Sequence, residues 1–399
     1  MIQKAVQGGN GMIRRHKVQI IIHCEEYEKR RQSLENLGQV KYRLPMINSY
    51  VMEVDEQLLD VIDAMDGLLS YELDTHITTQ MNRVSDIIEA RWAHEHGFYG
   101  TGIGVAVVDT GVALHKDFVE GGNRVTGFAD FINHRSEPYD DNGHGTHVAG
   151  IIGGNGYSSK GKYMGVAPEC NIIGVKVLDK RGDGNISDVL AGLQWIIDNR
   201  RKYNIRVVNI SVGTSSKDSL DENSLLVQGV NAVWDSGIVV VVAAGNNGPG
   251  PMSISTPGIS RKVITVGSSD DNMAVEVFGS GRTKDYSGRG PTPFCIKKPD
   301  IVAPGSNIIS CNISRYPSRG KNGEVYRIPT ESPMMYTAKS GTSMATPVVT
   351  GAVTLLLGAH PELTNREVKL KLRGCAINLG QHWEKQGWGL LNIRKLLEQ

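Results

Sequence analysis

The chain has 399 residues, 40% of them hydrophobic, and a formal net charge of +1 at pH 7. These values suit one large globular domain with a smaller one, and they leave no basic surplus for nucleic acid as a partner. No apolar run approaches membrane length, and residues 1–10 lack the apolar core of a signal peptide.

The N-terminal part predicts a small α/β domain over residues 17–80, preceded by an extension at residues 1–16. Strands and helices alternate in the order β-α-β-β-α-β, which is the order of a ferredoxin-like unit. Taken alone, this unit fits a generic binding module equally well. The strand-like segments are 17–24, 41–44, 50–54 and 68–73, and the helical patterns are 25–37 and 57–65.

A continuous apolar strand over residues 102–111 ends in Asp109 and a turn. Such a run is typical of a parallel strand that is buried on both faces. Its carboxylate is expected at the carboxyl end of the strand, where open α/β sheets bind their ligands. An aspartate in this position also fits a plain turn or helix cap.

His144 lies between two glycines at the start of an apolar helix, in the segment 141–152. Glycine on both sides lets another backbone approach the imidazole closely. The spacing of His144 and His147 also suggests a metal pair, but no third ligand stands at zinc spacing nearby. His147 is therefore interpreted as a packed structural histidine.

Ser343 stands at the start of the last long apolar helix, with small residues around it in the segment 340–347. Pro347 is expected in the first turn of that helix. Ser343 would then face the positive end of the helix dipole, where backbone N–H groups can bind an oxyanion. A Ser/Thr-rich N-cap of a core helix is the alternative.

The three motifs, in the chain order Asp109, His144, Ser343, resemble those of the subtilisin-like serine proteases, the subtilases. The resemblance extends from about residue 82 to the C-terminus. It implies that Ser343 is the nucleophile, His144 the general base and Asp109 the residue that orients the imidazole. It also implies an α/β fold over residues 81–399, with a doubly wound, mainly parallel sheet and helices on both faces.

The same resemblance assigns the oxyanion donor and the substrate-binding segments. Asn246 follows a buried strand and matches the oxyanion-hole asparagine of the family. Polypeptide substrates are expected to pair with main-chain groups on both sides of the cleft, and small residues form a pocket for a large apolar side chain. The substrate-binding residues are Gly182, Asp183, Gly184, Ser211, Val212, Gly213, Ala243, Ala244, Gly245 and Ser255.

A small α/β unit ahead of a subtilase domain resembles the family's propeptide, an inhibitor and folding aid removed by self-cleavage. We expect processing between residues 78 and 81, with Gln80 as the final propeptide residue and Met81 as the first mature residue. The expected partners are therefore polypeptide substrates and the chain's own propeptide, which blocks the cleft.

The chemistry needs no cofactor by this resemblance. Asp117 matches a calcium-binding aspartate of many subtilases. The loop at 153–163, however, is rich in glycine and lysine instead of carboxylates and amides. Calcium prefers several oxygen ligands, so we expect a structural calcium site there to be weakened or absent.

Five cysteines without paired spacing indicate free thiols and a reducing cytoplasm, with one pairing among a few of them as the alternative. The alternative is an extracellular location, reached by a non-standard export route. Two other functions stay open: a catalytically silent peptide-binding or regulatory protein of the same fold, and an exopeptidase, for which no terminal anchor is seen. The segment 310–336 is an insertion that suits a flap or a plain surface loop.

Overall fold

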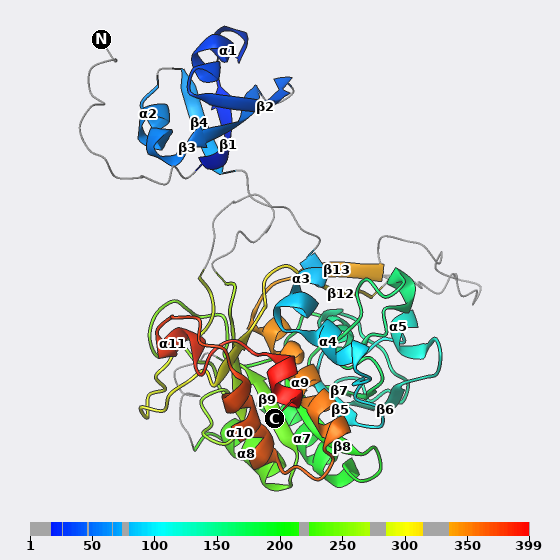
Figure 1. Cartoon of the computed structure of the whole chain (residues 1–399). Coiled ribbons are helices and arrows are strands. Elements are labelled where there is room, and N and C mark those ends of the chain that lie inside the picture. The colour runs from blue at the N-terminus through cyan, green and yellow to red at the C-terminus, as the bar shows by residue number, and fades with distance from the viewer. Residues whose placement is uncertain are drawn as a thin grey trace. The chain divides into compact units, whose positions relative to one another are not determined.

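The structure is a computed structural model that describes residues 17–25, 27–45, 48–65, 67–73, 80–214, 223–271, 285–313 and 335–398. The chain divides into two units, Met1–Thr78 and Thr79–Gln399 (Figure 1). The predicted extension at 1–16 lies outside the described residues, as does most of the insertion, 314–334.

The first unit is an antiparallel sheet with the strand order β2-β3-β1-β4, and its elements follow the predicted order. Ile20, Ile22, Met52 and Val54 alternate along β1 and β3 and pack with Ile62 in one core. Both helices are shorter than predicted. In the second, a 3-10 turn over Glu56–Leu58, capped by the Asp55 side chain, replaces the first residues. The elements are β1 (Lys17–Cys24), α1 (Tyr27–Glu35), β2 (Gly38–Leu44), β3 (Ser49–Asp55), α2 (Leu59–Asp63) and β4 (Leu68–Leu73).

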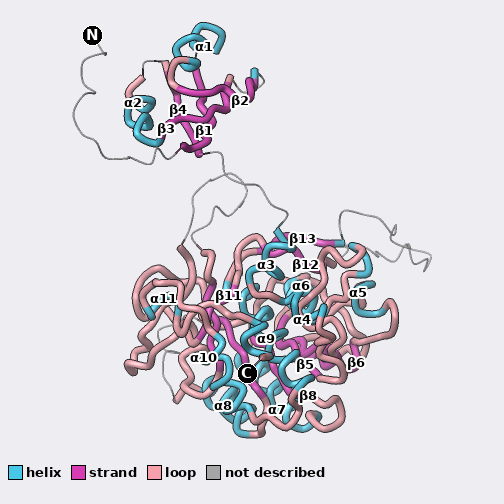
Figure 2. Tube along the Cα trace, in the orientation of Figure 1, coloured by secondary structure: helices cyan, strands magenta, loops and turns pink. Residues whose placement is uncertain are grey.

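The second unit is built on a seven-stranded parallel sheet with the order β11-β10-β9-β8-β5-β7-β6. Every residue of β5, β9 and β10 is buried, so both faces of the sheet are covered (Figure 2). The strands are β5 (Gly104–Asp109), β6 (Val125–Asp130), β7 (Asn171–Lys176), β8 (Ile205–Ile210), β9 (Val239–Ala243), β10 (Ile264–Ser268) and β11 (Ile301–Ala303).

The chain passes from β5 to strands on one side of it and then to β8 and later strands on the other side. Open α/β sheets bind ligands at such a switch point, outside the carboxyl ends of the strands. α6 packs against α9, and α7 packs against α8. The helices are α3 (Gln80–Ile87), α4 (Ala90–Glu95), α5 (Lys116–Val119), α6 (His144–Gly153), α7 (Ile186–Asn199), α8 (Leu225–Asp235), α9 (Thr342–Ala359), α10 (Asn365–Cys375), α11 (Trp383–Gln386) and α12 (Ile393–Leu397).

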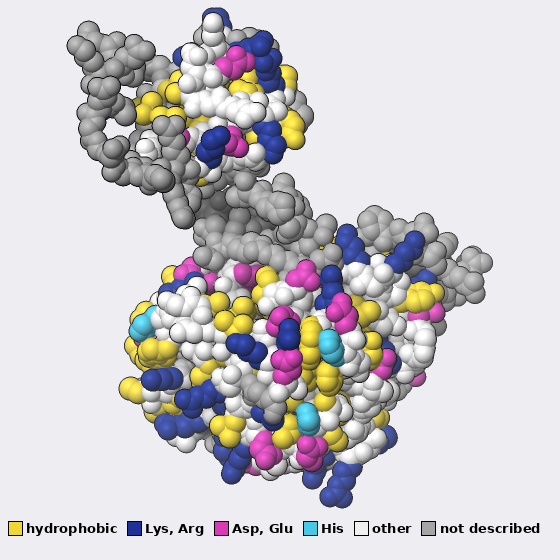
Figure 3. Space-filling view, viewed as in Figure 1, with side chains coloured by type: hydrophobic (Ala, Val, Ile, Leu, Met, Phe, Trp, Pro, Cys, Tyr) yellow, Lys and Arg dark blue, Asp and Glu magenta, His cyan; other side chains and the backbone are white. Residues whose placement is uncertain are grey.

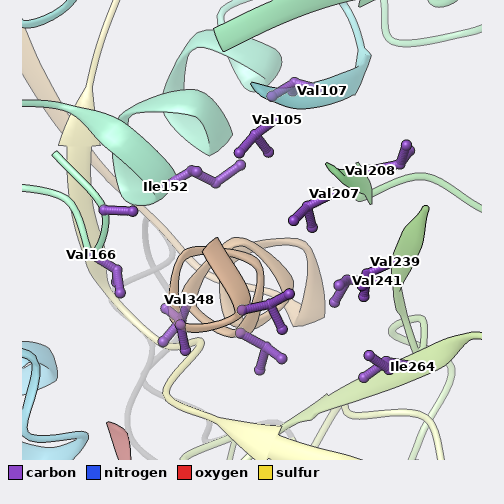
Figure 4. Close-up of a cluster of buried hydrophobic side chains, with 14 of the residues drawn as sticks. Val105, Val107, Ile152, Val166, Val207, Val208, Val239, Val241, Ile264 and Val348 are labelled. Atoms are coloured by element: carbon purple, nitrogen blue, oxygen red, sulfur yellow. The ribbon is translucent and has the colours of Figure 1, made fainter. Parts of the chain in front are cut away.

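α9 is the central helix of the core. Figure 4 shows it end-on, with Val348 surrounded by side chains such as Val105 of β5, Val241 of β9 and Ile152 of α6. Contrary to the expectation from the sequence, this helix of 18 residues is long and apolar enough to span a membrane by length and composition. Because 83% of its residues are buried inside the protein, α9 is the core helix of this domain.

A short antiparallel pair, β12 (Ile308–Cys311) and β13 (Tyr336–Lys339), borders the insertion. His147, in α6, fixes this pair to the core, since its Nε2–H lies 3.0 Å from the carbonyl oxygens of both Ile308 and Thr337. Its ring is fully buried, and burial lowers the pKa of His147 to about 3. The predicted structural role of His147 agrees with these contacts.

Candidate active site

Asp109 and His144 are joined at the carboxyl edge of the sheet. Asp109 is the last residue of β5 and is fully buried, while His144 is the first residue of α6. Nδ1 of His144 lies 2.7 Å from Oδ1 and 2.9 Å from Oδ2 of Asp109. A carboxylate only accepts, so Nδ1–H is the donor and Nε2 is left free to take a proton.

Two opposing effects act on the imidazole of His144. Burial lowers its pKa and the Asp109 carboxylate raises it, and the net result is a pKa above the ordinary value. The aspartate therefore stabilises the protonated ring, which is what a base needs when it takes a proton during reaction.

The glycines beside His144 have the close contacts that the sequence predicted. Gly143 has a φ of +95°, in the left-handed region, and caps α6. A Cβ on Gly145 would lie 2.1 Å from the carbonyl oxygen of Gly111. Any side chain at Gly145 would push α6 away from the turn after β5, and with it His144 away from Asp109.

Asp140 holds the start of α6 and was not singled out from the sequence. Its Oδ1 accepts from the Thr110 hydroxyl at 3.0 Å and from the Gly143 N–H at 2.8 Å, and its Oδ2 accepts from the N–H and hydroxyl of Thr146. Asp140 thus ties the turn after Asp109 to the helix of His144. An acidic residue a few positions before a helix start is a capping pattern that could have indicated it.

Lys176 is a second residue that the sequence did not reveal. It ends β7, is fully buried, and donates to the Thr110 carbonyl at 2.6 Å, the Leu178 carbonyl at 2.7 Å and Asp141 at 2.7 Å. A buried lysine is tolerated only with such partners. It fixes the two loops that carry Asp109 and His144.

Ser343 is the second residue of α9, and its hydroxyl donates to the Ser211 carbonyl at 2.9 Å. The Ser211 hydroxyl donates in return to the Ser343 carbonyl at 3.1 Å. Pro347 is the sixth residue of α9, so its expected place in the first turn is wrong. Having no N–H, it leaves the Ser343 carbonyl without its helical donor, and Ser211 supplies one from outside the helix.

Asn246 bonds to Thr342, the residue that precedes Ser343. Its Oδ1 accepts from the Thr342 N–H at 3.0 Å and from the Thr342 hydroxyl at 3.1 Å. These two bonds use only Oδ1 of Asn246, so its Nδ2 group takes no part in them. A Cβ on Gly341 would lie only 3.2 Å from Nδ2, so glycine gives the amide room. The Asn247 side chain instead donates to the Ser255 hydroxyl at 3.1 Å.

Two adjoining cavities contain these groups and share the segment 211–213. One, of about 460 Å³, is lined by His144 and the segment 182–184. The other, of about 240 Å³, is lined by Ser343, Asn246, Ala243, Gly245 and Ser255.

The predicted oxyanion and substrate-binding residues line these two cavities with one exception, and Asp109 bonds to His144. His144 and Ser343 lie in adjoining cavities, and the Ser343 hydroxyl bonds to Ser211 instead of to the imidazole. Ala244 does not line either cavity, because its side chain is fully buried against Val227, Ile254 and Ile259. The expectation that it forms part of the pocket floor is therefore wrong.

Residues 100–389 match the peptidase S8 family, described as the subtilase family. The chain belongs to the subtilase family. It is 38% identical over 380 residues to Serine protease AprX of Bacillus subtilis (strain 168), an alignment that covers 90% of this chain and 83% of AprX. It is 33% identical over 308 residues to Subtilisin Savinase of Lederbergia lenta, which covers 76% of this chain and 94% of Savinase.

Among solved structures, a cold adapted subtilisin-like serine proteinase matches with a TM-score of 0.55 and 31% identity, over 74% of this chain and 90% of that chain. The subtilase described here is a subtilisin-like serine endopeptidase, a hydrolase whose substrates are polypeptides.

Asp117, the possible calcium ligand of this subtilase, accepts hydrogen bonds from protein donors. Its Oδ1 accepts from the Ser158 N–H at 3.0 Å, and its Oδ2 accepts from the Tyr336 hydroxyl at 2.7 Å. His115 and Cys311 lie close by, with ligand atoms within 4.8 Å of one another. Both ring nitrogens of His115 are already bonded to backbone, to the Asp117 N–H and the Met335 carbonyl. These residues do not fit a calcium ion, which takes several oxygen ligands.

Proposed function

We propose that this subtilase cleaves extended polypeptides through an acyl-enzyme on Ser343. The supporting observation is the Asp109–His144 pair, which leaves Nε2 unprotonated in a cavity that adjoins the one holding Ser343. Rotation about the Cα–Cβ bond of Ser343 exchanges its bond to the Ser211 carbonyl for one to the imidazole. Hydrogen bonds of this kind are often formed only when substrate is bound.

In the first step, His144 takes the hydroxyl proton while the Ser343 oxygen attacks the carbonyl carbon of the substrate. The tetrahedral oxyanion is stabilised by Nδ2 of Asn246 and by the N–H of Ser343 at the start of α9. His144 then gives its proton to the leaving amine. A water molecule, deprotonated by the same ring, releases the acyl group.

Substrate recognition follows from the two edges of the cleft. The segments 182–184 and 211–213 offer main-chain groups on opposite sides of an extended peptide, and main-chain pairing gives affinity without strong sequence preference. The cavity bounded by Ala243, Gly245 and Ser255 holds the side chain before the cut. Its small lining residues favour a large apolar side chain there.

We also propose that the chain is a zymogen whose first unit inhibits and is then removed by self-cleavage. The unit boundary after Thr78 lies close to the expected cut. Residues 74–79 lie outside the described residues, and Gln80 and Met81 are the first residues of α3. Because proteases bind extended chain, cleavage after Gln80 requires the first turn of α3 to unwind.

No cofactor takes part in this chemistry, and the hydrogen bonds of Asp117 argue against a calcium ion at that position. All five cysteines are free, four of them buried and Cys295 exposed. Free thiols are typical of reducing compartments, which supports a cytoplasmic location.

The test compares the full-length protein with its Ser343→Ala variant. A fluorophosphonate probe should label the wild type at Ser343 and leave the variant unlabelled. A fragment of about eighty residues, the size expected from the division into two units, should be released from the wild type alone. Failure to label the isolated second unit would favour the catalytically silent alternative. Equal processing of both proteins would rule out self-cleavage.

A further inference from the structure

A third cavity, of about 360 Å³, combines aromatic side chains with a concentration of positive charge. The described residues that line it include five cationic side chains and one carboxylate, Asp235, whereas the whole chain carries only +1. The cations are Arg261, Lys262, Arg366, Lys369 and Arg373, and the apolar lining residues are Trp234, Trp388 and Leu370.

The cavity lies at the amino ends of the strands, whereas the catalytic residues lie at their carboxyl ends. Trp234 is near the end of α8, which leads into the amino end of β9, and the segment 261–263 leads into the amino end of β10. The catalytic groups follow the carboxyl ends of the strands. Five residues of β9 span about 17 Å, so one short peptide cannot fill both sites.

The wall of the cavity is fixed by Lys369 of α10. Its Nζ donates to the carbonyl oxygens of Arg261, Lys262 and Val263 at 3.0, 3.0 and 2.8 Å, and it lies 3.5 Å from Asp300. The fully buried Lys298 lies 2.6 Å from the same carboxylate. Two ammonium groups thus share one aspartate beneath the cavity, and positive charge remains in excess there.

The outer rim is formed by one face of α10. Arg366, Leu370 and Arg373 stand at spacings of four and seven residues, which share a helix face. All three are exposed, Leu370 to 66%. Among the residues that the structure describes, neither arginine has a hydrogen-bond or ion-pair partner. Figure 3 shows Lys and Arg side chains gathered over the part of the second unit where Figure 1 places α8 and α10.

We propose that this cavity is an exosite that docks an acidic segment of a polypeptide substrate together with one large apolar side chain. The inference rests on the proposed function, because the substrates are polypeptides. Arginine pairs with carboxylates through two parallel hydrogen bonds, and Trp388 and Leu370 provide the apolar contact. A cavity of this volume holds one large side chain, and the partnerless Arg366 and Arg373 are placed to pair with acidic neighbours of that side chain.

The consequence is selection among long substrates. A polypeptide that binds both sites gains affinity, because its second contact forms at a high effective concentration. The gain in affinity lowers KM for substrates that carry the acidic segment. The KM of short peptides that reach only the cleft does not change.

Binding is tested in the full-length Ser343→Ala background, so that the result does not depend on catalysis. The probe is a fluorescein-labelled peptide of Asp and Glu residues around one Phe, followed by anisotropy. The double substitution Arg366→Glu and Arg373→Glu should weaken binding by about tenfold or more. The matched control is Arg201→Glu with Lys202→Glu, which reverses the same charge elsewhere and should leave binding unchanged. Equal binding by the two double variants would overturn the proposal.

Two further arms identify the ligand class and separate this inference from the chemistry. ATP and a single-stranded oligonucleotide are tested as competitors of the peptide. If either of them binds and the acidic peptide does not, the proposal is also overturned. In the active protein, two substrates share one cleavage sequence and differ in a distal acidic, Phe-containing tail. The tail should lower KM in the wild type and not in the Arg366/Arg373 variant, while the tailless substrate is cut equally by both.

Discussion

The Asn246→Asp substitution removes one donor of the proposed oxyanion hole. Asp retains the oxygen that accepts from the N–H and hydroxyl of Thr342, so the local hydrogen bonds survive. It replaces Nδ2 by a second oxygen, so the donor is lost and the ionised carboxylate adds a negative charge beside the developing oxyanion. The backbone N–H of Ser343 remains as the other donor.

The expected loss falls on kcat. Removal of one such donor costs about 100- to 1000-fold in kcat, or about 2.7–4 kcal/mol, because a charged oxygen in a water-poor site depends strongly on each hydrogen bond. KM should change little, since the ground-state carbonyl lies off the donor position. The assay is steady-state hydrolysis of a chromogenic peptide by the processed enzyme, measured on the pH plateau.

The matched control is Asn247→Asp, which makes the same chemical change in the next residue. The Asn247 side chain donates to Ser255, away from Thr342, so its kcat should stay within about threefold of the wild type. A fall of less than about tenfold in the Asn246 variant, or a loss confined to KM, would refute the assignment of Asn246.

Four further outcomes are expected. Because the base form of His144 reacts and its pKa is raised above 6.5, kcat/KM should rise with pH through that higher pKa. Asp109→Asn should move the rise to lower pH and reduce kcat by about 10⁴-fold, whereas an unchanged acid limb would count against the pairing. Gly145→Ala should lower the free energy of unfolding by about 1–3 kcal/mol in urea titrations, because its Cβ meets backbone, while Gly250→Ala, with open space around it, should not. Tyr336→Phe should cost about 1–3 kcal/mol by removing the hydroxyl that bonds buried Asp117, and loss of the exposed Tyr157 hydroxyl in Tyr157→Phe should cost nothing measurable. The difference in Tm between the wild type and Asp117→Asn should be the same with and without EDTA. A difference that depends on calcium would show that an ion binds this carboxylate.

The sequence was most informative where function depends on neighbours in the chain. The residues around His144 and Ser343 are glycines and small side chains whose purpose is local, so short motifs identified them. The order of strands and helices in the first unit likewise predicted a ferredoxin-like arrangement, and the continuous apolar run of β5 predicted a parallel strand buried on both faces.

Contacts between distant segments could not be predicted in this way. Lys176 bonds to residues 35 and 66 positions away, and the cations of the third cavity come from two segments about 100 positions apart. Ala244 looked like its neighbours Ala243 and Gly245, but the alternation of side chains along the chain turns it into the core. The position of Pro347 in α9 depended on an outside donor, Ser211, which helix rules alone do not supply.

The reciprocal bonds between Ser211 and Ser343 have a mechanical consequence. A proline-made gap in the ladder of α9 is closed by a residue of the substrate-binding edge, and the nucleophile's own hydroxyl bonds back to that same residue. The segment that contains Ser211 and the start of α9 are therefore held together at two points. When the Ser343 hydroxyl turns to the imidazole in the proposed reaction, the bond from the Ser211 hydroxyl to the Ser343 carbonyl still joins the two segments.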